Sequence, residues 1–170
     1  MKTFAVILPL TMSLVSSIDG SGSEVLARFR GGIGVQPVLN VSGQNADGTF
    51  ANVTRNVVRG VTPAGPWRID DLKAVIQTDG HVRVSGRGLL LASGNRIGQN
   101  AGQRVFATLI CEEAAPFVER NTATAGVLLE TNGDFEIDDV LDQVPSDCAS
   151  PVLLIRAASN QTWFAAGILQ

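Results

Sequence analysis

Hydrophobic and polar residues alternate with a period of two along several stretches of the chain. The alternation is clear in residues 25–30, 72–77 and 81–87, where every second residue is apolar or small. Successive side chains of a β-strand point to opposite faces, so this period predicts strands that bury one face. Helical periodicity is almost absent. The pattern therefore favours an all-β fold.

Turn residues separate these segments in a way that predicts hairpins. Thr78-Asp79-Gly80 lies between residues 72–77 and 81–87, and Asn132-Gly133 lies between 126–130 and 135–140. Asp-Gly and Asn-Gly favour the tight turns of hairpins because both residues tolerate positive φ. The second strand of the first hairpin is expected to direct four polar side chains outward: His81, Arg83, Ser85 and Arg87.

Residues 104–111 are almost wholly apolar, which predicts a central strand buried on both faces. Further strands are predicted in 35–41 and 53–61, after a glycine-rich turn at 31–34, and in 152–157 and 163–167. About eight or nine short strands predict an antiparallel two-sheet β-sandwich, Ig-like in the broad sense. A closed barrel is the alternative.

The first residues, MKTFAVILPLTMSLVSS, have the pattern of a secretion signal. Lys2 precedes an apolar run, and small residues near Ser17 suit a signal peptidase. The alternatives are a first strand or a membrane anchor, but a span needs about 20 apolar residues and this run is shorter. We therefore expect a signal peptide at 1–17, a flexible leader at 18–23 and one domain at 24–170, secreted or periplasmic and without a membrane span.

Composition narrows the possible partners. The chain has 170 residues, of which 45% are hydrophobic and 17% are charged, which argues against disorder. The formal net charge of −3 gives no reason to expect a nucleic acid or an anionic membrane as the partner.

Cys111 and Cys148 are the two cysteines of the chain. In an exported protein they most simply form one disulfide, and two free buried thiols are the alternative. The closed loop of about 38 residues corresponds to roughly 3–4 kcal/mol on the chain-entropy model. Two cysteines and one distant histidine are too few ligands for a metal site.

Three carboxylates follow one another at every second residue: Asp134, Glu136 and Asp138. On a strand they share one face, while Phe135 and Ile137 point into the core. Calcium prefers several oxygen ligands, so these residues are candidate calcium ligands. A flat strand does not wrap an ion, however, and we favour a solvated strand face over a metal or catalytic site.

Two other acidic sets and the single histidine are candidates for catalysis. A hydrolase would need two carboxyl groups about 5–9 Å apart across a groove. His81 would be the base of a Ser-His-Asp triad, but the chain has no G-x-S-x-G motif for the nucleophile. We therefore expect an exposed His81. The carboxylates considered for hydrolysis are Asp70, Asp71, Asp138 and Asp139.

The polar loop 93–103, SGNRIGQNAGQ, is a candidate for ligand contact. It lacks the Gly-Lys-Ser/Thr of a phosphate-binding loop and leads into a strand instead of a helix. Asn95, Arg96 and Asn100 are the side chains that we consider for hydrogen bonds to a sugar or a peptide. The alternative is a plain long loop.

Trp67 and Trp163 are expected to pack in the core or at a sheet edge, with an exposed binding anchor as the alternative for a tryptophan near a Pro-rich turn. Asn40, Asn52 and Asn160 fit the acceptor pattern for N-glycosylation, which matters in a eukaryotic source.

Several segments resemble small secreted bacterial proteins with no assigned activity: VVRGVTPAGPWRIDDLKA, GRGLLLASGNRIG, RVFATLIC, GDFEIDDVL, the Cys148-x-x-PVLLIRA run and WFAAGI. The resemblance covers roughly residues 57–168. It implies a fold of the β-sandwich kind and contributes no catalytic residues.

A looser resemblance links Gly-Asp-Phe-x-Ile to transthyretin-like sandwiches. Enzymes of that fold hydrolyse hydroxyisourate and carry a C-terminal Tyr-Arg-Gly-Ser, whereas this chain ends in WFAAGILQ and has no tyrosine.

The sequence favours a secreted, non-enzymatic β-sandwich that acts as a binding or structural surface module. Its partner would be an extracellular protein, a glycan or a small molecule, and we expect no cofactor. The alternatives are an exported hydrolase that uses the carboxylates named above, and a small carrier that holds an apolar ligand between the sheets.

Overall fold

The computed structural model describes residues 23–36, 40–41, 46, 53–54 and 56–170. The predicted signal peptide, most of the predicted leader and the sequon at Asn52 lie outside the described residues. Within them the chain forms strands and no helix. The strands are β1 (Val25–Gly34), β2 (Asn40–Val41), β3 (Val53–Thr54), β4 (Trp67–Arg68), β5 (Asp71–Gln77), β6 (His81–Arg87), β7 (Leu90–Leu91), β8 (Arg104–Ile110), β9 (Arg120–Asn121), β10 (Val127–Leu128), β11 (Phe135–Val140), β12 (Val152–Ala157) and β13 (Trp163–Leu169).

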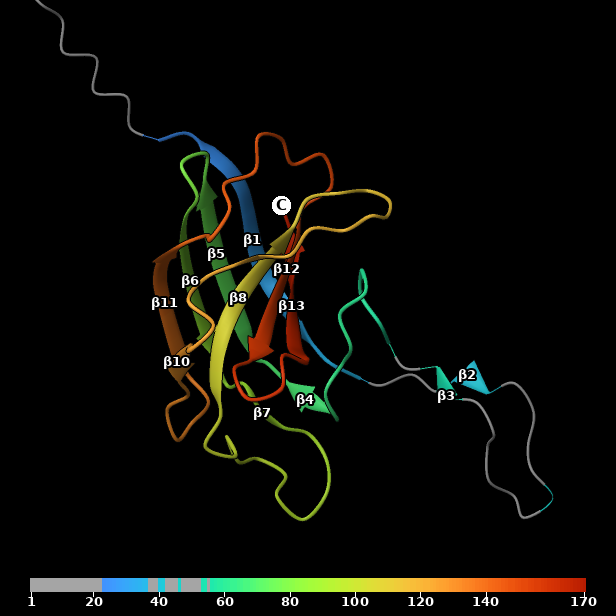
Figure 1. The fold of residues 1–170 in the computed structure, drawn as a ribbon. Coiled ribbons are helices and arrows are strands. Elements are labelled where there is room, and N and C mark those ends of the chain that lie inside the picture. Colours follow the sequence, from blue (N-terminus) through green and yellow to red (C-terminus); the bar gives the residue numbers. More distant parts are fainter. Residues whose placement is uncertain (1–22, 37–39, 42–45, 47–52, 55) are drawn as a thin grey trace, which may run out of the picture.

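Nine of these strands form one antiparallel sheet (Figure 1). Its order is β10-β8-β12-β13-β1-β5-β6-β11, and β9 pairs with β8. The pairs β2-β3 and β4-β7 form two small sheets. The prediction of an all-β, mainly antiparallel fold is therefore confirmed.

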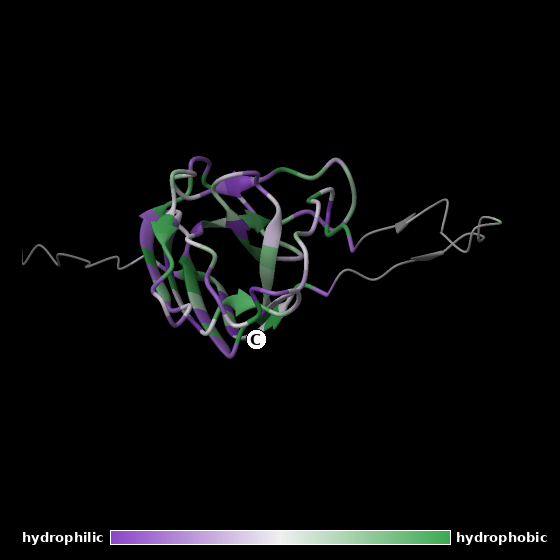
Figure 2. Cartoon of the chain, turned by 90° about the horizontal axis from the view of Figure 1, so that it is seen from below, coloured by the Kyte–Doolittle hydropathy of each residue, from purple (hydrophilic) through white to green (hydrophobic). Residues whose placement is uncertain are grey.

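The main sheet is curled into a half-barrel, and its strands surround the core when they are viewed end-on (Figure 2). Two hydrogen bonds link β9 to the segment after β11: the backbone amide of Asp142 donates to Asn121 O at 2.8 Å, and the backbone amide of Asn121 donates to Asp142 Oδ1 at 2.9 Å. We expected two separate sheets. The strands form one continuous sheet because β1 pairs with both β13 and β5, which joins the two halves.

The alternating segments bury the predicted face. Leu72, Ala74 and Ile76 of β5 are buried, and so are Val82 and Val84 of β6. β8 is buried on both faces after its first residue, as its apolar sequence predicted. Residues from both halves of the curled sheet share a single core.

Two local predictions were wrong. The glycine-rich segment 31–34 belongs to β1 and is not a turn. Glycine is required at Gly34 because a Cβ there would lie 2.2 Å from the carbonyl oxygen of Trp67. The Asn132-Gly133 turn forms, but the flanking strands do not pair with each other, since β10 pairs with β8 and β11 pairs with β6.

The predicted disulfide is confirmed. Cys111 follows β8 and is bonded to Cys148 in the loop before β12, with an S–S distance of 2.05 Å. Arg59 links its own segment of the chain to the loop that contains Cys148. Its guanidinium donates to Ser150 O at 2.7 Å and to Ser150 Oγ at 2.6 Å. The disulfide indicates an oxidising compartment. No helix among the described residues has the length and apolarity needed to cross a membrane.

Candidate functional site

A pocket of about 430 Å³ lies where three distant segments meet, residues 63–67, 91–103 and 159–164. We call it the end pocket. Its size is within the range of small-molecule sites in proteins. It brings together several residues that the sequence analysis considered separately.

Two aromatic rings form the floor of the end pocket. Trp67 of β4 and Phe164 of β13 are stacked, with ring centroids 4.0 Å apart and an angle of 15° between the rings. Val35 fixes this pair, because the Val35 amide donates to Phe164 O and the Trp67 amide donates to Val35 O. Leu91, which pairs with Trp67, and Ala101 add further apolar surface. Both rings are buried, so they support the pocket from below.

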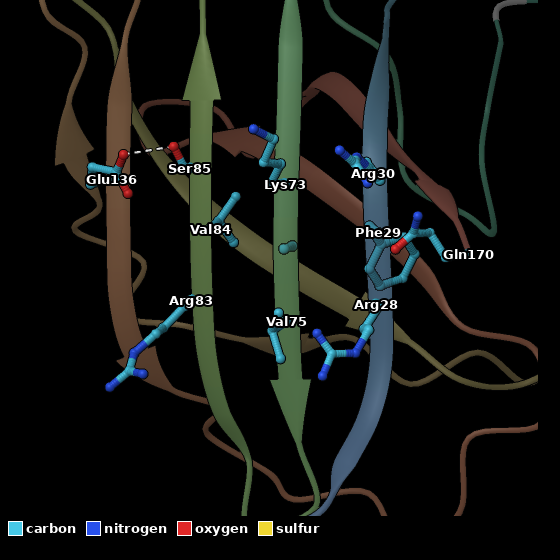
Figure 3. A pocket seen from close by; sticks show the side chains of 11 residues that line it. Arg28, Phe29, Arg30, Lys73, Val75, Arg83, Val84, Ser85, Glu136 and Gln170 are labelled. Carbon is cyan, nitrogen blue, oxygen red and sulfur yellow. Dashed lines mark hydrogen bonds between the residues drawn. The ribbon is translucent and has the colours of Figure 1, made fainter.

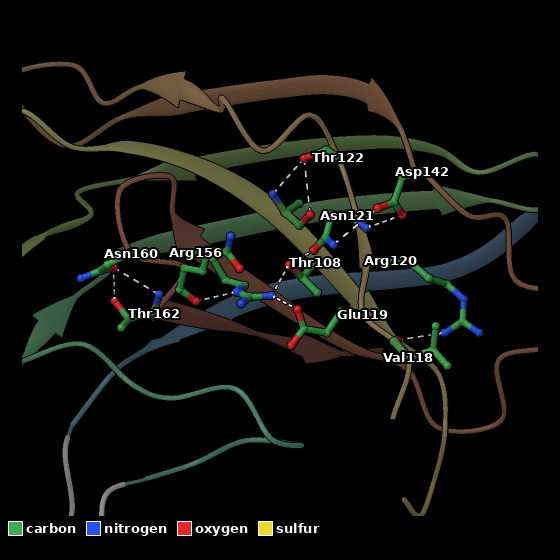
Figure 4. Close-up of polar contacts among 12 residues, drawn as sticks. Thr108, Val118, Glu119, Arg120, Asn121, Thr122, Asp142, Arg156, Asn160 and Thr162 are labelled. Atoms are coloured by element: carbon green, nitrogen blue, oxygen red, sulfur yellow. Dashed lines mark hydrogen bonds and ion pairs between the residues drawn. The ribbon is translucent and has the colours of Figure 1, made fainter. Parts of the chain in front are cut away.

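The turn between β12 and β13 supplies part of a polar rim. Asn160 Oδ1 accepts hydrogen bonds from the Thr162 amide at 3.2 Å and from the Thr162 hydroxyl at 2.8 Å (Figure 4). These contacts use the amide oxygen of Asn160, and its NH₂ group donates to no other group in the described part of the chain. Arg156 holds the same turn from below, donating from Nε to Gln161 O at 2.8 Å.

The loop 93–103 supplies the opposite side of the rim. Arg96 lines the pocket, and its Nε donates to Gln99 Oε1 at 3.2 Å. Gln103 also lines it and accepts a hydrogen bond from the Ser159 hydroxyl at 3.1 Å. Apart from Arg96, the polar side chains of the rim are uncharged amides and hydroxyls: Gln103, Ser159, Asn160 and Thr162.

The three candidates from this loop have different positions. Arg96 lines the end pocket. Asn100 anchors the loop, because its Nδ2 donates to Leu129 O at 3.1 Å and to Glu130 O at 2.9 Å. Asn95 is exposed and does not belong to the pocket wall.

The candidate calcium ligands each have a partner of their own. Asp134 Oδ1 accepts from the Gly88 amide at 3.0 Å, and Glu136 Oε1 accepts from the Ser85 hydroxyl at 2.7 Å. Asp138 is hydrogen-bonded to His81 and to Arg83. Glu136 and Asp138 are exposed on β11, the arrangement expected of a solvated strand face. In the described part of the chain, no group of three or more acidic, histidine or cysteine side chains is placed to hold a metal ion.

His81 lies on β6 with its ring hydrogen-bonded to a carboxylate. Its Nε2 is 2.5 Å from Asp138 Oδ1, and Arg83 Nε donates to Asp138 Oδ2 at 3.2 Å. The hydrogen bond with His81, followed by the bond from Arg83, lowers the pKa of Asp138 although desolvation opposes the shift. This cluster holds β6 and β11 together across their outer face.

The carboxylates considered for hydrolysis do not converge. Asp71 is opposite Arg87 in the strand register, whereas Asp139 is opposite Val82, five positions along β6. At about 3.4 Å per residue this separates them by roughly 17 Å. Asp70 is paired with Arg68, and Asp139 accepts from the Ala123 amide at 2.8 Å.

Sequence reasoning missed most of the rim. Ser159 and Thr162 lie in an ordinary turn sequence, and Gln103 lies in the loop 93–103 but was not among the side chains considered there. Their common position arises when β13 and the end of loop 93–103 fold against β4. No family model, curated protein or solved structure matches this chain.

Proposed function

We propose that this protein is an exported, non-enzymatic binding module whose end pocket holds a neutral sugar unit. The observation that carries the proposal is the chemistry of the pocket wall: an apolar floor over the stacked Trp67 and Phe164, and a rim of amides and hydroxyls. A sugar ring has an apolar C–H face and a rim of hydroxyl groups, so it complements such a surface.

The rim offers the donors that sugar hydroxyls need. The NH₂ group of Asn160 is free of the turn contacts that its oxygen makes, and the terminal nitrogens of Arg96 extend beyond its contact with Gln99. Each hydrogen bond to a ligand contributes on the order of 1 kcal/mol. Of the residues that the structure describes, those lining the pocket include no carboxylate, which fits a ligand without positive charge.

The compartment and the overall class support the same proposal. The Cys111–Cys148 disulfide and the predicted signal peptide agree with export. The facing halves of the curled sheet enclose one core, so we also propose that the domain belongs with the sandwiches in the broad, Ig-like sense and with the secreted bacterial proteins that it resembles. A hydrolase has less support because its carboxylates lie apart, and a carrier of an apolar ligand has less support because the end pocket is open at the surface.

The substitution Asn160→Asp tests the pocket without disturbing the turn. Aspartate keeps the oxygen that accepts from Thr162 but removes the NH₂ donor. We expect the affinity for mono- and oligosaccharides, measured by calorimetry after a glycan-array screen, to fall about tenfold, since one hydrogen bond is lost.

Asn95→Asp is the matched control, because it makes the same change in a neighbouring loop outside the pocket wall. It should leave the affinity unchanged. Absence of any saccharide binding by the unaltered protein, or an equal loss in both variants, would contradict the proposal.

A further inference from the structure

The outer face of β1, β5, β6 and β11 contains a second hollow, a groove of about 420 Å³ (Figure 3). We call it the cationic groove. Four basic side chains line it: Arg28 and Arg30 from β1, Lys73 from β5 and Arg83 from β6. One carboxylate, Glu136, lies at its β11 side. The groove is therefore strongly positive on a chain whose formal net charge is −3.

The strand register explains why these charges gather. Arg30 is opposite Lys73 on the neighbouring strand, and Arg28 and Arg83 are both opposite Val75. Neighbouring strands lie about 4.8 Å apart, and outward-facing residues on one strand repeat at about 6.7 Å. The four basic groups thus occupy two rows across the sheet, around the small side chain of Val75.

The carboxylates near this face only partly neutralise it. Arg83 shares Asp138 with His81, and Lys73 Nζ is 3.5 Å from Asp71 Oδ2. Among the residues that the structure describes, no ion pair involves Arg28 or Arg30. Glu136 is hydrogen-bonded to Ser85, which holds it on the β11 side. Positive charge therefore dominates the β1 side of the groove.

We propose that the cationic groove binds the carboxylate or sulfate groups of an acidic polysaccharide. Arginine suits this role because its planar N–H groups match the geometry of such oxyanions. The basic residues lie one or two strand spacings apart, about 5 to 10 Å, which suits a chain that carries anionic groups at intervals better than a single small ion. The proposal does not rest on the end pocket, with which the groove shares no residue.

Other anionic partners fit the groove less well. Proteins that bind single-stranded nucleic acid usually stack bases on exposed aromatic side chains, and the aromatic residue of the groove, Phe29, is 2% exposed. A membrane surface would favour exposed apolar side chains that insert beside the charges. The apolar side chain among the basic groups, Val75, is short and half-buried, so it offers little to insert. An acidic peptide added as a strand would need a free edge, whereas β1, β5 and β6 each pair on both sides.

The test measures binding of the full-length exported protein to heparin, which carries sulfate groups, and to polygalacturonate, which carries carboxylates. Binding at low ionic strength should weaken as salt is added. The double substitution Arg28→Gln with Arg30→Gln should weaken it at least tenfold. Glu136→Gln should strengthen it, because this change removes negative charge while keeping an oxygen for Ser85.

Arg68→Gln is the control, since Arg68 is exposed on β4 and does not line the groove. It should leave binding unchanged. Binding to only one of the two polymers would assign the anionic group. Failure to bind either polymer, an equal loss in Arg68→Gln, or equally tight binding of single-stranded DNA would overturn the proposal.

Discussion

Arginine side chains on the outer faces of the two halves of the curled sheet have contrasting surroundings. On β12, Arg156 is covered by the segment 112–122, with a side chain that is 5% exposed and Nη1 2.6 Å from Glu119 Oε2 (Figure 4). On β1, Arg28 and Arg30 lie uncovered along the cationic groove. The residue type is the same, but the segment 112–122 covers the outer face of the first half, and no described segment covers that of the second. We call them the roofed half and the uncovered half. Arg156 is therefore part of a buried network, whereas Arg28 and Arg30 are exposed to solvent.

Removal of Arg156 should have the largest effect on stability. Its guanidinium also donates to Gln161 O and lies 5.4 Å from the centre of the Phe106 ring. Breaking such a buried network typically costs 3–5 kcal/mol, so we expect Arg156→Ala to lower the free energy of unfolding by about 3 kcal/mol. Arg28→Ala should change it by less than about 0.5 kcal/mol, as exposed sites do. Urea unfolding of the two variants measures the difference, and equal losses would remove the contrast between the faces.

A smaller effect should separate the inner from the outer face of one strand. A Cβ at Gly86 of β6 would lie 2.1 Å from Cε1 of Phe135, whose ring is buried. Overpacking of this kind costs about 1–3 kcal/mol, so Gly86→Ala should destabilise by about 2 kcal/mol. Ser85→Ala, one residue earlier on the outer face, should cost less than about 1 kcal/mol. Thermal melts of both variants test this, and a larger loss at Ser85 would show that the inner face yields more easily than its packing suggests.

The sequence predicted the uncovered half well because each of its strands has one face exposed to solvent. Alternation in β5 and β6 predicted which side chains are buried, and it predicted that Arg83 and Ser85 point outward. The same reasoning gives no prediction for Arg156, because residues 152–157 are apolar apart from this one and do not alternate. Its burial depends on a loop that lies more than 30 positions away in the chain, and no local pattern encodes that contact.

Period-two patterning is also insensitive to how strands are joined laterally. A two-sheet sandwich and a curled single sheet bury the same alternate residues, so the pairing of β1 with both β13 and β5 had no signature in the sequence. The candidate site follows the same rule. Arg96 was identified as a polar side chain in a long loop, but the residues across the pocket from it, Ser159 and Asn160, join it only through the fold.

The smallest predicted effect concerns acid stability, and it should come from the roofed half. The hydrogen bond from Arg120 holds the pKa of Glu112 at about 2, below its usual value of 4.5, against a smaller opposing effect of desolvation. Because the folded-state pKa is depressed, the stabilisation is fully present above pH 4.5 and is lost as the pH falls towards 2. Glu112→Gln should therefore flatten the loss of stability in that range. At neutral pH it should cost less than about 1 kcal/mol, since the pair is partly hydrated.

Glu113→Gln, at the exposed neighbouring position, is the matched control. Unfolding curves between pH 2 and 7 measure both variants, and a profile for Glu112→Gln that matches the unaltered protein would show that this contact of the roof does not contribute to the difference between the halves.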